Sequence, residues 1–306
     1  MSTLSDSLDD YLRLRRLLGY KLERVGQVLA DFVAFSEDAG ADHIDTDVAV
    51  SWALRSPNPD SSWRAGRLGA VRGFARYLHA LDPRHDVPPP RLISRGVGRP
   101  APWIFTNDQV IELMSAARRL RSPLQAATLE TVVGLLWTTG LRVGEAVRLN
   151  NNDLDMTAGV LTVQDSKNGR SRVVPIDPST INALGTYIVS RDRLRPDATS
   201  NSLFVSTVGR RLRTGNLGVA FGSVVALAGL PARHDRVGPR LGGLRHSFAV
   251  QTLIEWHNAN LDVGSLMPRL STYMGHVNPA STYWYLSASP ELLAAAAARL
   301  NDGTLQ

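Results

Sequence analysis

The chain has 306 residues, of which 43% are hydrophobic and 20% are charged, and this length and composition suit two folded domains with separate cores. No apolar run is long enough to cross a membrane, "MSTLSDSLDD" lacks the basic and apolar parts of a signal peptide, and cysteine is absent. These features exclude disulfides, thiolate nucleophiles and cysteine-ligated zinc, and they favour an intracellular, cytoplasmic enzyme or binding protein.

The charge is distributed unevenly along the chain. Residues 1–95 carry 13 basic and 13 acidic side chains, whereas residues 96–306 carry 21 and 15 and account for the net charge of +6. Such an excess suits a polyanionic partner such as nucleic acid. Nearly all the basic residues are arginine, and lysine occurs only at Lys21 and Lys167. Lys167 is therefore a candidate for a role that arginine cannot fill, because an ammonium can give up a proton and a guanidinium effectively cannot.

Residues 1–92 carry the patterns of a small helical domain. Leucines at helical spacing run through residues 4–19, and the apolar pattern of residues 23–40 ends at a glycine. Residues 61–81 form a basic amphipathic pattern without an acidic side chain. A solvated charged face and a nucleic-acid contact are both compatible with this last segment.

A proline-rich stretch without helical periodicity, residues 82–103, follows this helical part, and we place the linker at residues 93–104. Residues 105–306 predict a second domain that is mostly helical. Alternation across residues 159–176, around Asn168-Gly169, predicts a hairpin and hence a small antiparallel sheet. Helices are expected at about residues 106–120, 124–149, 178–193, 214–229, 242–259 and 289–300. The predicted fold class is mainly α (α+β).

Two details of this second domain are specific. Thr106 and Gln109 have the spacing of a capping box at the start of a helix. The apolar helix that begins near residue 124 should stop at Gly140 and restart after Arg142.

Three short motifs in this domain carry side chains suited to phosphate chemistry. The first, "TTGLRVGEAVRL", places Glu145 one helical turn after Arg142, a pair that is more often structural than functional. The second, "DSKNGRS", places Lys167 at the tip of the hairpin. The third begins with Arg245 and His246 in "LRHSFAV" and continues in "MGHVNPASTYWYL".

Together these residue types could cleave a phosphodiester. Two guanidinium groups, from Arg142 and Arg245, could bind both non-bridging oxygens of a phosphate. A nearby tyrosine hydroxyl could attack phosphorus as a covalent nucleophile, and Lys167 could protonate the leaving oxygen. The sequence has no carboxylate cluster of the metal-site type, so we expect arginines to stabilise the transition state, with neither a metal nor a cofactor.

The order and spacing of these motifs resemble the tyrosine recombinases, the phage integrase family. The matching stretches are "TTGLRVGEAVRL", "SKNGRSRVVPI", "GLRHSFA" and "MGHVNPASTYWY", and the resemblance covers roughly residues 106–300. "STYMGHVNPASTYWYLSASPELL" is similar to the integrase-type transposases of mobile elements. The helical residues 1–92 resemble, more loosely, the family's core-binding (SAM-like) domain.

The resemblance implies strand cleavage through a 3′-phosphotyrosyl bond, strand exchange and religation of DNA in the nucleoid. The implied catalytic residues are Tyr285 as nucleophile, Lys167 as general acid, Arg142, Arg245 and His276, with Glu145 and His246 in support. Tyr283 lies about 200° around a helix from Tyr285, so the two cannot face one phosphate together. The predicted DNA contacts are Arg64, Arg72, Arg76, Arg170, Arg172, Arg210 and Arg211.

The resemblance also implies a homo-oligomer, dimer to tetramer, on double-stranded DNA, with accessory recombinases as further partners. The helix expected at residues 289–300 would then dock on a neighbouring protomer, although packing on its own domain is the alternative.

One position departs from the family pattern. The second arginine motif usually begins with a hydrogen-bonding residue, often histidine, three positions before its arginine, and this chain has Gly242 there, followed by Gly243. Glycine offers no side-chain hydrogen bond to a phosphate and cannot accept a proton. A catalytically impaired DNA-binding accessory subunit is therefore one alternative, and a type IB topoisomerase-like strand cleaver is another.

Overall fold

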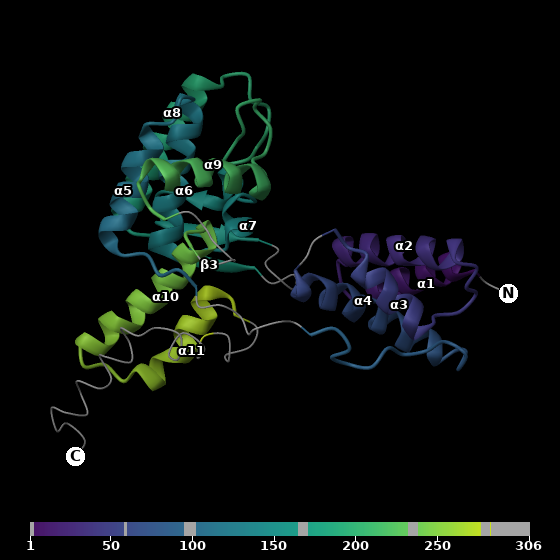
Figure 1. The fold of residues 1–306 in the computed structure, drawn as a ribbon. Coiled ribbons are helices and arrows are strands. Elements are labelled where there is room, and N and C mark those ends of the chain that lie inside the picture. The colour runs from purple at the N-terminus through teal and green to yellow at the C-terminus, as the bar shows by residue number, and fades with distance from the viewer. Residues whose placement is uncertain are drawn as a thin grey trace, which may run out of the picture. The chain divides into compact units, whose positions relative to one another are not determined.

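The computed structural model describes residues 3–57, 60–94, 102–164, 171–231, 238–276 and 282. Its contacts divide the chain into two compact units, Met1–Arg99 and Pro100–Gln306, and the division falls within the expected linker. Each unit has its own hydrophobic core, and Figure 1 shows the ribbon of both units.

The regular secondary structure in the described part of the first unit is all helical, as the sequence predicted. Its helices are α1 (Leu4–Leu17), α2 (Glu23–Asp38), α3 (Thr46–Leu54) and α4 (Ser61–His79). Phe32 of α2 and Phe74 of α4 are fully buried in its core, and Trp52 of α3 meets Phe32 edge-on, with ring centroids 5.1 Å apart. Helix α3 was not predicted from the sequence. Its nine residues give little room for a periodic pattern, and the clearest local signal is Asp45, whose side chain accepts a hydrogen bond from the backbone N–H of Val48.

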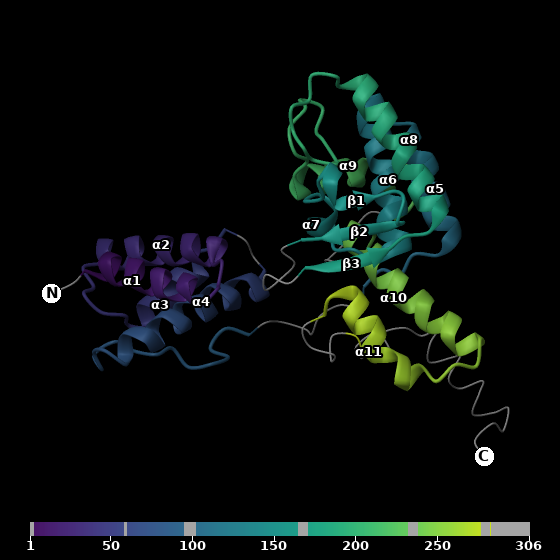
Figure 2. The same ribbon diagram turned by 180° about the vertical axis from the view of Figure 1, so that it is seen from behind.

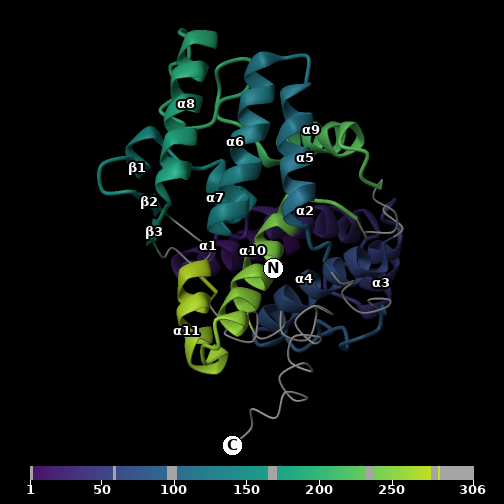
Figure 3. The same ribbon diagram turned by 90° about the vertical axis from the view of Figure 1, so that its left-hand side faces the viewer.

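The second unit surrounds one apolar helix. Its helices are α5 (Asn107–Arg118), α6 (Pro123–Thr139), α7 (Val143–Ala146), α8 (Pro178–Leu194), α9 (Thr214–Leu227), α10 (Leu241–Asn258) and α11 (Val263–Met274). Helix α6 contacts α5, α8, α9 and α10 (Figures 1 and 3), and Leu129, Val133 and Leu136 on it are buried. A helix enclosed on several sides has no single polar face, which explains why this segment is apolar almost throughout its length.

Two predicted helix boundaries are confirmed. The Thr106 side chain accepts a hydrogen bond from the Gln109 N–H (3.2 Å), and the Gln109 side chain accepts one from the Thr106 N–H (3.3 Å), so the capping box is present. Helix α6 ends at Gly140, whose φ of +60° lies in the left-handed region, and α7 begins directly after Arg142.

The small antiparallel sheet has three strands in the order β1 (Leu154–Asp155), β2 (Val160–Val163) and β3 (Arg172–Pro175) (Figure 2). The β2–β3 pair confirms the predicted hairpin, and Val163 opposite Arg172 is its last pair before the connecting segment. The tip itself, residues 165–170, lies outside the described residues. Strand β1 was not predicted, since two residues are too few for a readable alternation.

Helices α10 and α11 pack against each other at one end of this unit (Figures 1 and 2). The sequence did not predict α11, because Pro268 inside it is a residue that normally interrupts a helix. The helix expected at residues 289–300 lies outside the described residues. Among the helices that the structure describes, none has the length and apolarity required to span a bilayer.

Candidate active site

Arg142 occupies the short bend between α6 and α7. The left-handed turn at Gly140 redirects the chain, so that Arg142 is the N-cap of α7 with extended backbone. Its Nη1 donates to Glu145 Oε1 (2.7 Å) and its Nη2 donates to the carbonyl of Gly275 (2.9 Å), a residue 133 positions away in the chain. This guanidinium, 30% exposed, therefore connects α7 to the end of α11.

Glu145 is a buried carboxylate, with a side chain only 1% exposed. Burial alone would raise its pKa, but hydrogen bonds from Arg172, from the backbone N–H of Arg142 and from the Arg142 guanidinium outweigh burial and lower the pKa to about 2. The carboxylate is therefore ionised throughout the neutral range. Its geometry suits an anchor for arginines rather than a proton acceptor.

Arg245 approaches the same place from the second turn of α10. Its side chain is buried, Nη1 donates to the carbonyl of Gly140 (2.6 Å), and Nη2 donates to the carbonyl of Met274 (2.7 Å). Arg245 thus connects the end of α6 with the end of α11. Gly140 lies 105 positions before it in the sequence, and Met274 lies 29 positions after it.

His276 follows the left-handed Gly275 that ends α11, and its N–H donates to the carbonyl of Ser271 (2.9 Å). Its Nδ1 lies 2.6 Å from Thr282 Oγ1. Burial, followed by the positive charges of Arg245 and Arg142, lowers the pKa of His276 to about 4, and half-buried His246 adds a smaller lowering contribution. The imidazole is therefore neutral at physiological pH in the protein without a bound anion.

The structure thus brings together Arg142 of the first motif with Arg245 and His276 of the third. Glu145 lies beneath them as the partner of Arg142. Tyr285 and Lys167 lie outside the described residues, as does Arg170, and their roles remain predictions from the sequence.

Arg172, predicted as a DNA contact, belongs to this cluster instead of standing at the surface. Its side chain is 14% exposed, Nη2 donates to Glu145 Oε2 (2.8 Å), and Nε donates to the carbonyl of Tyr273 (2.9 Å). Its position in the strand gave no indication of this. The available signal was Glu145 in the first motif, because a carboxylate that becomes buried needs hydrogen-bond donors beyond a single arginine.

The other predicted DNA contacts differ in how their guanidinium groups are engaged. Arg76 and Arg210 are exposed. Arg211 Nη1 donates to the carbonyl of Arg148 (2.7 Å), and Arg64 donates to the carbonyl of Ser56 (3.3 Å).

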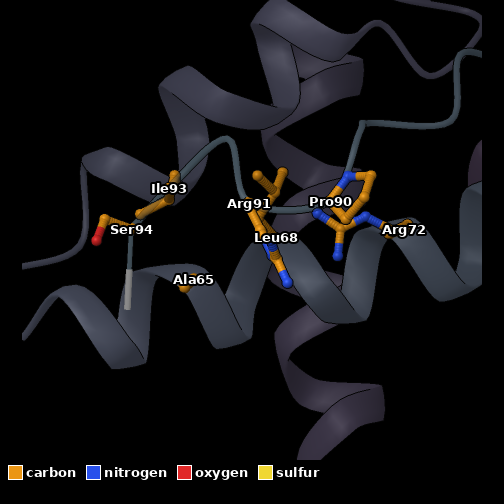
Figure 4. A pocket seen from close by; sticks show the side chains of 7 residues that line it. All are labelled: Ala65, Leu68, Arg72, Pro90, Arg91, Ile93 and Ser94. Atoms are coloured by element: carbon orange, nitrogen blue, oxygen red, sulfur yellow. The ribbon is translucent and has the colours of Figure 1, made fainter. Parts of the chain in front are cut away.

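Arg72 of α4 lines a cavity of about 530 Å³ within the first unit (Figure 4). Its Nε donates to the carbonyl of Pro88 (2.6 Å) and its Nη2 to that of Pro89 (2.7 Å). Arg91 lines the same cavity, so this part of α4 and the segment after it present two guanidinium groups to one hollow (Figure 4).

The two glycines at the start of α10 have opposite surroundings. Gly242 is exposed, and a Cβ added there would meet no atom within 4 Å. A Cβ added at Gly243 would lie 2.8 Å from the Phe105 ring and 2.9 Å from the Trp103 carbonyl. Packing against the segment before α5 therefore requires glycine at 243, whereas nothing in the described structure requires it at 242.

Comparison with known proteins agrees with this geometry. The model of the phage integrase family matches residues 104–291. A putative integrase/recombinase, y4rB of Sinorhizobium fredii, is 41% identical over 306 residues, which are 98% of this chain and 98% of that protein. The tyrosine recombinase XerC of Roseiflexus castenholzii is 32% identical over 241 residues, covering 78% of this chain and 72% of that protein.

Among solved structures, the Tn1549 transposon integrase in complex with transposon right end DNA matches with a TM-score of 0.68. The match covers 98% of this chain and 100% of that one at 19% identity, so it supports the fold alone. The sequence matches carry the family assignment, and the mostly helical fold with its small antiparallel sheet agrees with it. The chain therefore belongs to the phage integrase family of tyrosine recombinases, enzymes of site-specific recombination that act by cleaving and rejoining DNA.

Proposed function

We propose that the protein is a site-specific recombinase of the integrase-type transposase class, which cleaves and rejoins double-stranded DNA through a 3′-phosphotyrosyl intermediate. One observation carries this proposal. Arg142 and Arg245, 103 positions apart in the sequence by their numbering, donate to the adjacent carbonyls of Gly275 and Met274, directly before His276. Two guanidinium groups fixed at one point form a site for one phosphate.

The proposed reaction is a transesterification at phosphorus. The Tyr285 hydroxyl oxygen forms a bond to phosphorus while the bond from phosphorus to the 5′ oxygen breaks. The tyrosine proton passes to a base in the site or to water, and Lys167 donates a proton to the departing 5′ oxygen. Arg142 and Arg245 stabilise the charge on the non-bridging oxygens. Rejoining is the same reaction in reverse, so the ester bond energy is retained.

His276 is suited to a role beside this phosphate. In the protein without DNA its pKa is about 4 because of burial and the neighbouring arginines. A bound phosphodiester places negative charge against those arginines, and we propose that it brings the pKa of His276 back towards the neutral range. The imidazole can then take or give a proton during cleavage.

We further propose that the protein acts as a homo-oligomer on DNA, because strand exchange requires two DNA sites to be cleaved and joined to each other. The Tn1549 integrase, which has a similar fold, was solved in complex with transposon right end DNA, and we propose double-stranded DNA as the substrate of this chain.

Trapping of a covalent adduct tests the proposal. The suicide substrates are a set of overlapping nicked DNA duplexes that cover the DNA on both sides of the gene for this protein. Denaturing electrophoresis then detects protein that is covalently joined to DNA. Peptide mass spectrometry should then place the phosphate on Tyr285. An adduct on Tyr283 would overturn the assignment of the nucleophile. Specific DNA binding without any adduct would instead identify an accessory subunit, and relaxation of supercoils without joining of two sites would identify a topoisomerase-like activity.

Gly242 provides a direct test of whether the missing side chain limits the reaction. Because a side chain at 242 has open space around it, Gly242→His should fold normally and increase the rate of adduct formation, by up to about 10-fold, without changing DNA affinity. Gly242→Ala is the matched control, since it adds a Cβ without a hydrogen-bonding group. An unchanged or lower rate for the histidine variant would show that this active site works with glycine.

A further inference from the structure

The backbone that leads into His276 is held from several directions. The last carbonyls of a helix have no intrahelical partner and carry the negative end of its dipole. At the end of α11, three consecutive carbonyls accept hydrogen bonds from three arginines, namely Tyr273 from Arg172, Met274 from Arg245 and Gly275 from Arg142. The N–H of His276 then donates to the carbonyl of Ser271 (2.9 Å). These bonds place the backbone of His276, and they do not determine how its ring is turned.

The ring of His276 contacts a buried hydroxyl group. Its Nδ1 lies 2.6 Å from Oγ1 of Thr282, a residue six positions later in the chain. Thr282 is 0% exposed, so water does not compete for this hydroxyl. A hydrogen bond to one ring nitrogen determines which nitrogen of a neutral histidine carries the proton. Thr282 therefore fixes both the rotation of the ring and its tautomer.

The surroundings of the hydroxyl indicate the direction of this hydrogen bond. In the part of the chain that the structure describes, Nδ1 of His276 is the one polar atom that hydrogen-bonds the Thr282 side chain. A buried O–H group without an acceptor is costly, so the hydroxyl donates to Nδ1. The neutral ring then carries its proton on Nε2.

The ring is neutral in the protein without DNA for the reasons given above. Burial comes first among the causes that lower the pKa of His276 to about 4. The charged and titratable groups around the ring lower this pKa further, and they lie on three elements. They are Arg245 of α10, Arg142 before α7, His246 of α10 and Arg172 of β3.

A hydroxyl can remain the partner of this ring when the ring gains a proton. Threonine has one O–H donor and two acceptor lone pairs. It donates to Nδ1 of a neutral imidazole, and after rotation of its O–H it accepts from the Nδ1–H of an imidazolium. A carboxylate in the same place would favour the charged form of the ring throughout. A hydroxyl therefore suits a histidine whose protonation changes when an anion binds.

We propose that Thr282 is a positioning residue for His276, whose hydroxyl holds Nδ1 so that Nε2 carries the N–H that serves the bound phosphate. This proposal rests on the proposed function, in which His276 acts beside the phosphate bound by Arg142 and Arg245. Thr282 itself contacts no DNA and takes part in no bond making or breaking. It acts by fixing the rotation and the tautomer of one imidazole ring.

The first test reads the tautomer directly and needs no DNA. In isotope-labelled protein near neutral pH, two-bond proton–nitrogen correlation spectra distinguish a protonated ring nitrogen from an unprotonated one, and His276→Gln assigns the signals of His276. We expect the wild-type protein and Thr282→Ser to show protonated Nε2 and unprotonated Nδ1. Thr282→Val, which keeps the shape but removes the hydroxyl, should show both tautomers in exchange. Thr131→Val, at a half-buried threonine on α6, is the matched control and should keep the wild-type signals.

The second test measures adduct formation on the suicide substrates, in single turnover at saturating DNA. We expect Thr282→Val to lower the rate roughly 10–100-fold, the range found when the partner that orients a metal-binding histidine is removed. Thr282→Ser should stay within about 3-fold of the wild-type rate, because it keeps the hydroxyl. Thr131→Val should cleave at the wild-type rate. DNA affinity, measured by fluorescence anisotropy, should be unchanged in all of these variants.

A double variant shows whether Thr282 acts through His276. If its effect is on that ring alone, adding Thr282→Val to His276→Gln should cause no further loss of rate. An effect of valine on the packing of the domain would instead reduce the rate by the same factor in both backgrounds. Thermal unfolding of each variant records any loss of stability separately.

Several results would overturn the proposal. A wild-type spectrum with the proton on Nδ1, or with both tautomers in exchange, would contradict the assigned hydrogen bond. A loss of rate in Thr282→Ser as large as that in Thr282→Val would show that the hydroxyl is not the group that matters. Multiplied losses in the double variant would make Thr282 a packing residue. Absence of any adduct with the wild-type protein, together with the expected tautomer, would contradict the proposed function and leave the assigned hydrogen bond in place.

Discussion

Replacement of Arg245 by alanine is expected to lower the rate of covalent adduct formation about 10²–10³-fold, the usual effect of removing one charged donor from a transition-state site. The side chain lies buried between the carbonyls of Gly140 and Met274, so it is already oriented before DNA binds. DNA affinity should fall less than about 10-fold, since many other basic residues contribute to binding. Single-turnover cleavage of a suicide substrate and anisotropy measure the two effects separately.

Arg245→Lys and Arg193→Ala are the matched controls. Lysine keeps the charge but cannot reach both carbonyls, so we expect Arg245→Lys to remain strongly impaired. Arg193 is exposed on α8, and its removal should leave cleavage unchanged. Cleavage by Arg245→Ala at the wild-type rate would exclude Arg245 from the phosphate site. Loss of binding in proportion to cleavage would reduce its role to DNA affinity.

Gly140→Ala should destabilise the catalytic unit by about 2–4 kcal/mol through two separate costs. The first cost is steric, because a Cβ there would lie 2.4 Å from Cδ1 of Phe248, and this ring is held by stacking on Tyr273 with centroids 5.6 Å apart. The second cost is backbone strain, because the φ of residue 140 is +60°. The melting temperature should fall by roughly 10 °C for a domain of this size. Cleavage should fall as well, because the carbonyl of Gly140 positions Arg245.

Gly134→Ala is the control for this substitution. It lies in the same helix, α6, and its Cβ would meet only the flexible end of Met114 at 3.4 Å, so alanine should be neutral or slightly stabilising there. Calorimetry or thermal circular dichroism compares the two variants with the wild type. If Gly140→Ala melted at the temperature of Gly134→Ala, the tight fit against Phe248 described here would be incorrect.

The sequence predicted three local features correctly. The Gly140 stop, the Thr106–Gln109 capping box and the β2–β3 hairpin each depend on a few neighbouring residues, and the structure confirms all three. Where local signals conflict with long-range packing, the prediction failed. Helix α11 was missed because Pro268 contradicts its helical pattern locally, and packing against α10 is a long-range effect that overrides it.

The site shows the same division. Arg142 and Arg245 were singled out from their motifs, and the structure brings their side chains to adjacent carbonyls at the end of α11. The position of Arg172 could not be read in this way, because it depends on Glu145 and Tyr273, which lie 27 and 101 positions from it. The sequence pattern of a strand does not show which of its arginines forms buried hydrogen bonds with distant residues.

The convergence of three arginines on the end of α11 also determines the stage of synthesis and folding at which the site can form. The hydrogen bonds from Arg142, Arg245 and Arg172 include partners 133, 105 and 101 positions away, so they are among the most distant contacts of the fold. Contacts of high sequence separation close late, after the loop entropy between them has been lost. During synthesis, Arg142 leaves the ribosome well before α11 does. A nascent or partly folded chain therefore lacks these hydrogen bonds, and under the proposed function the capacity to break strands arrives only with the folded domain.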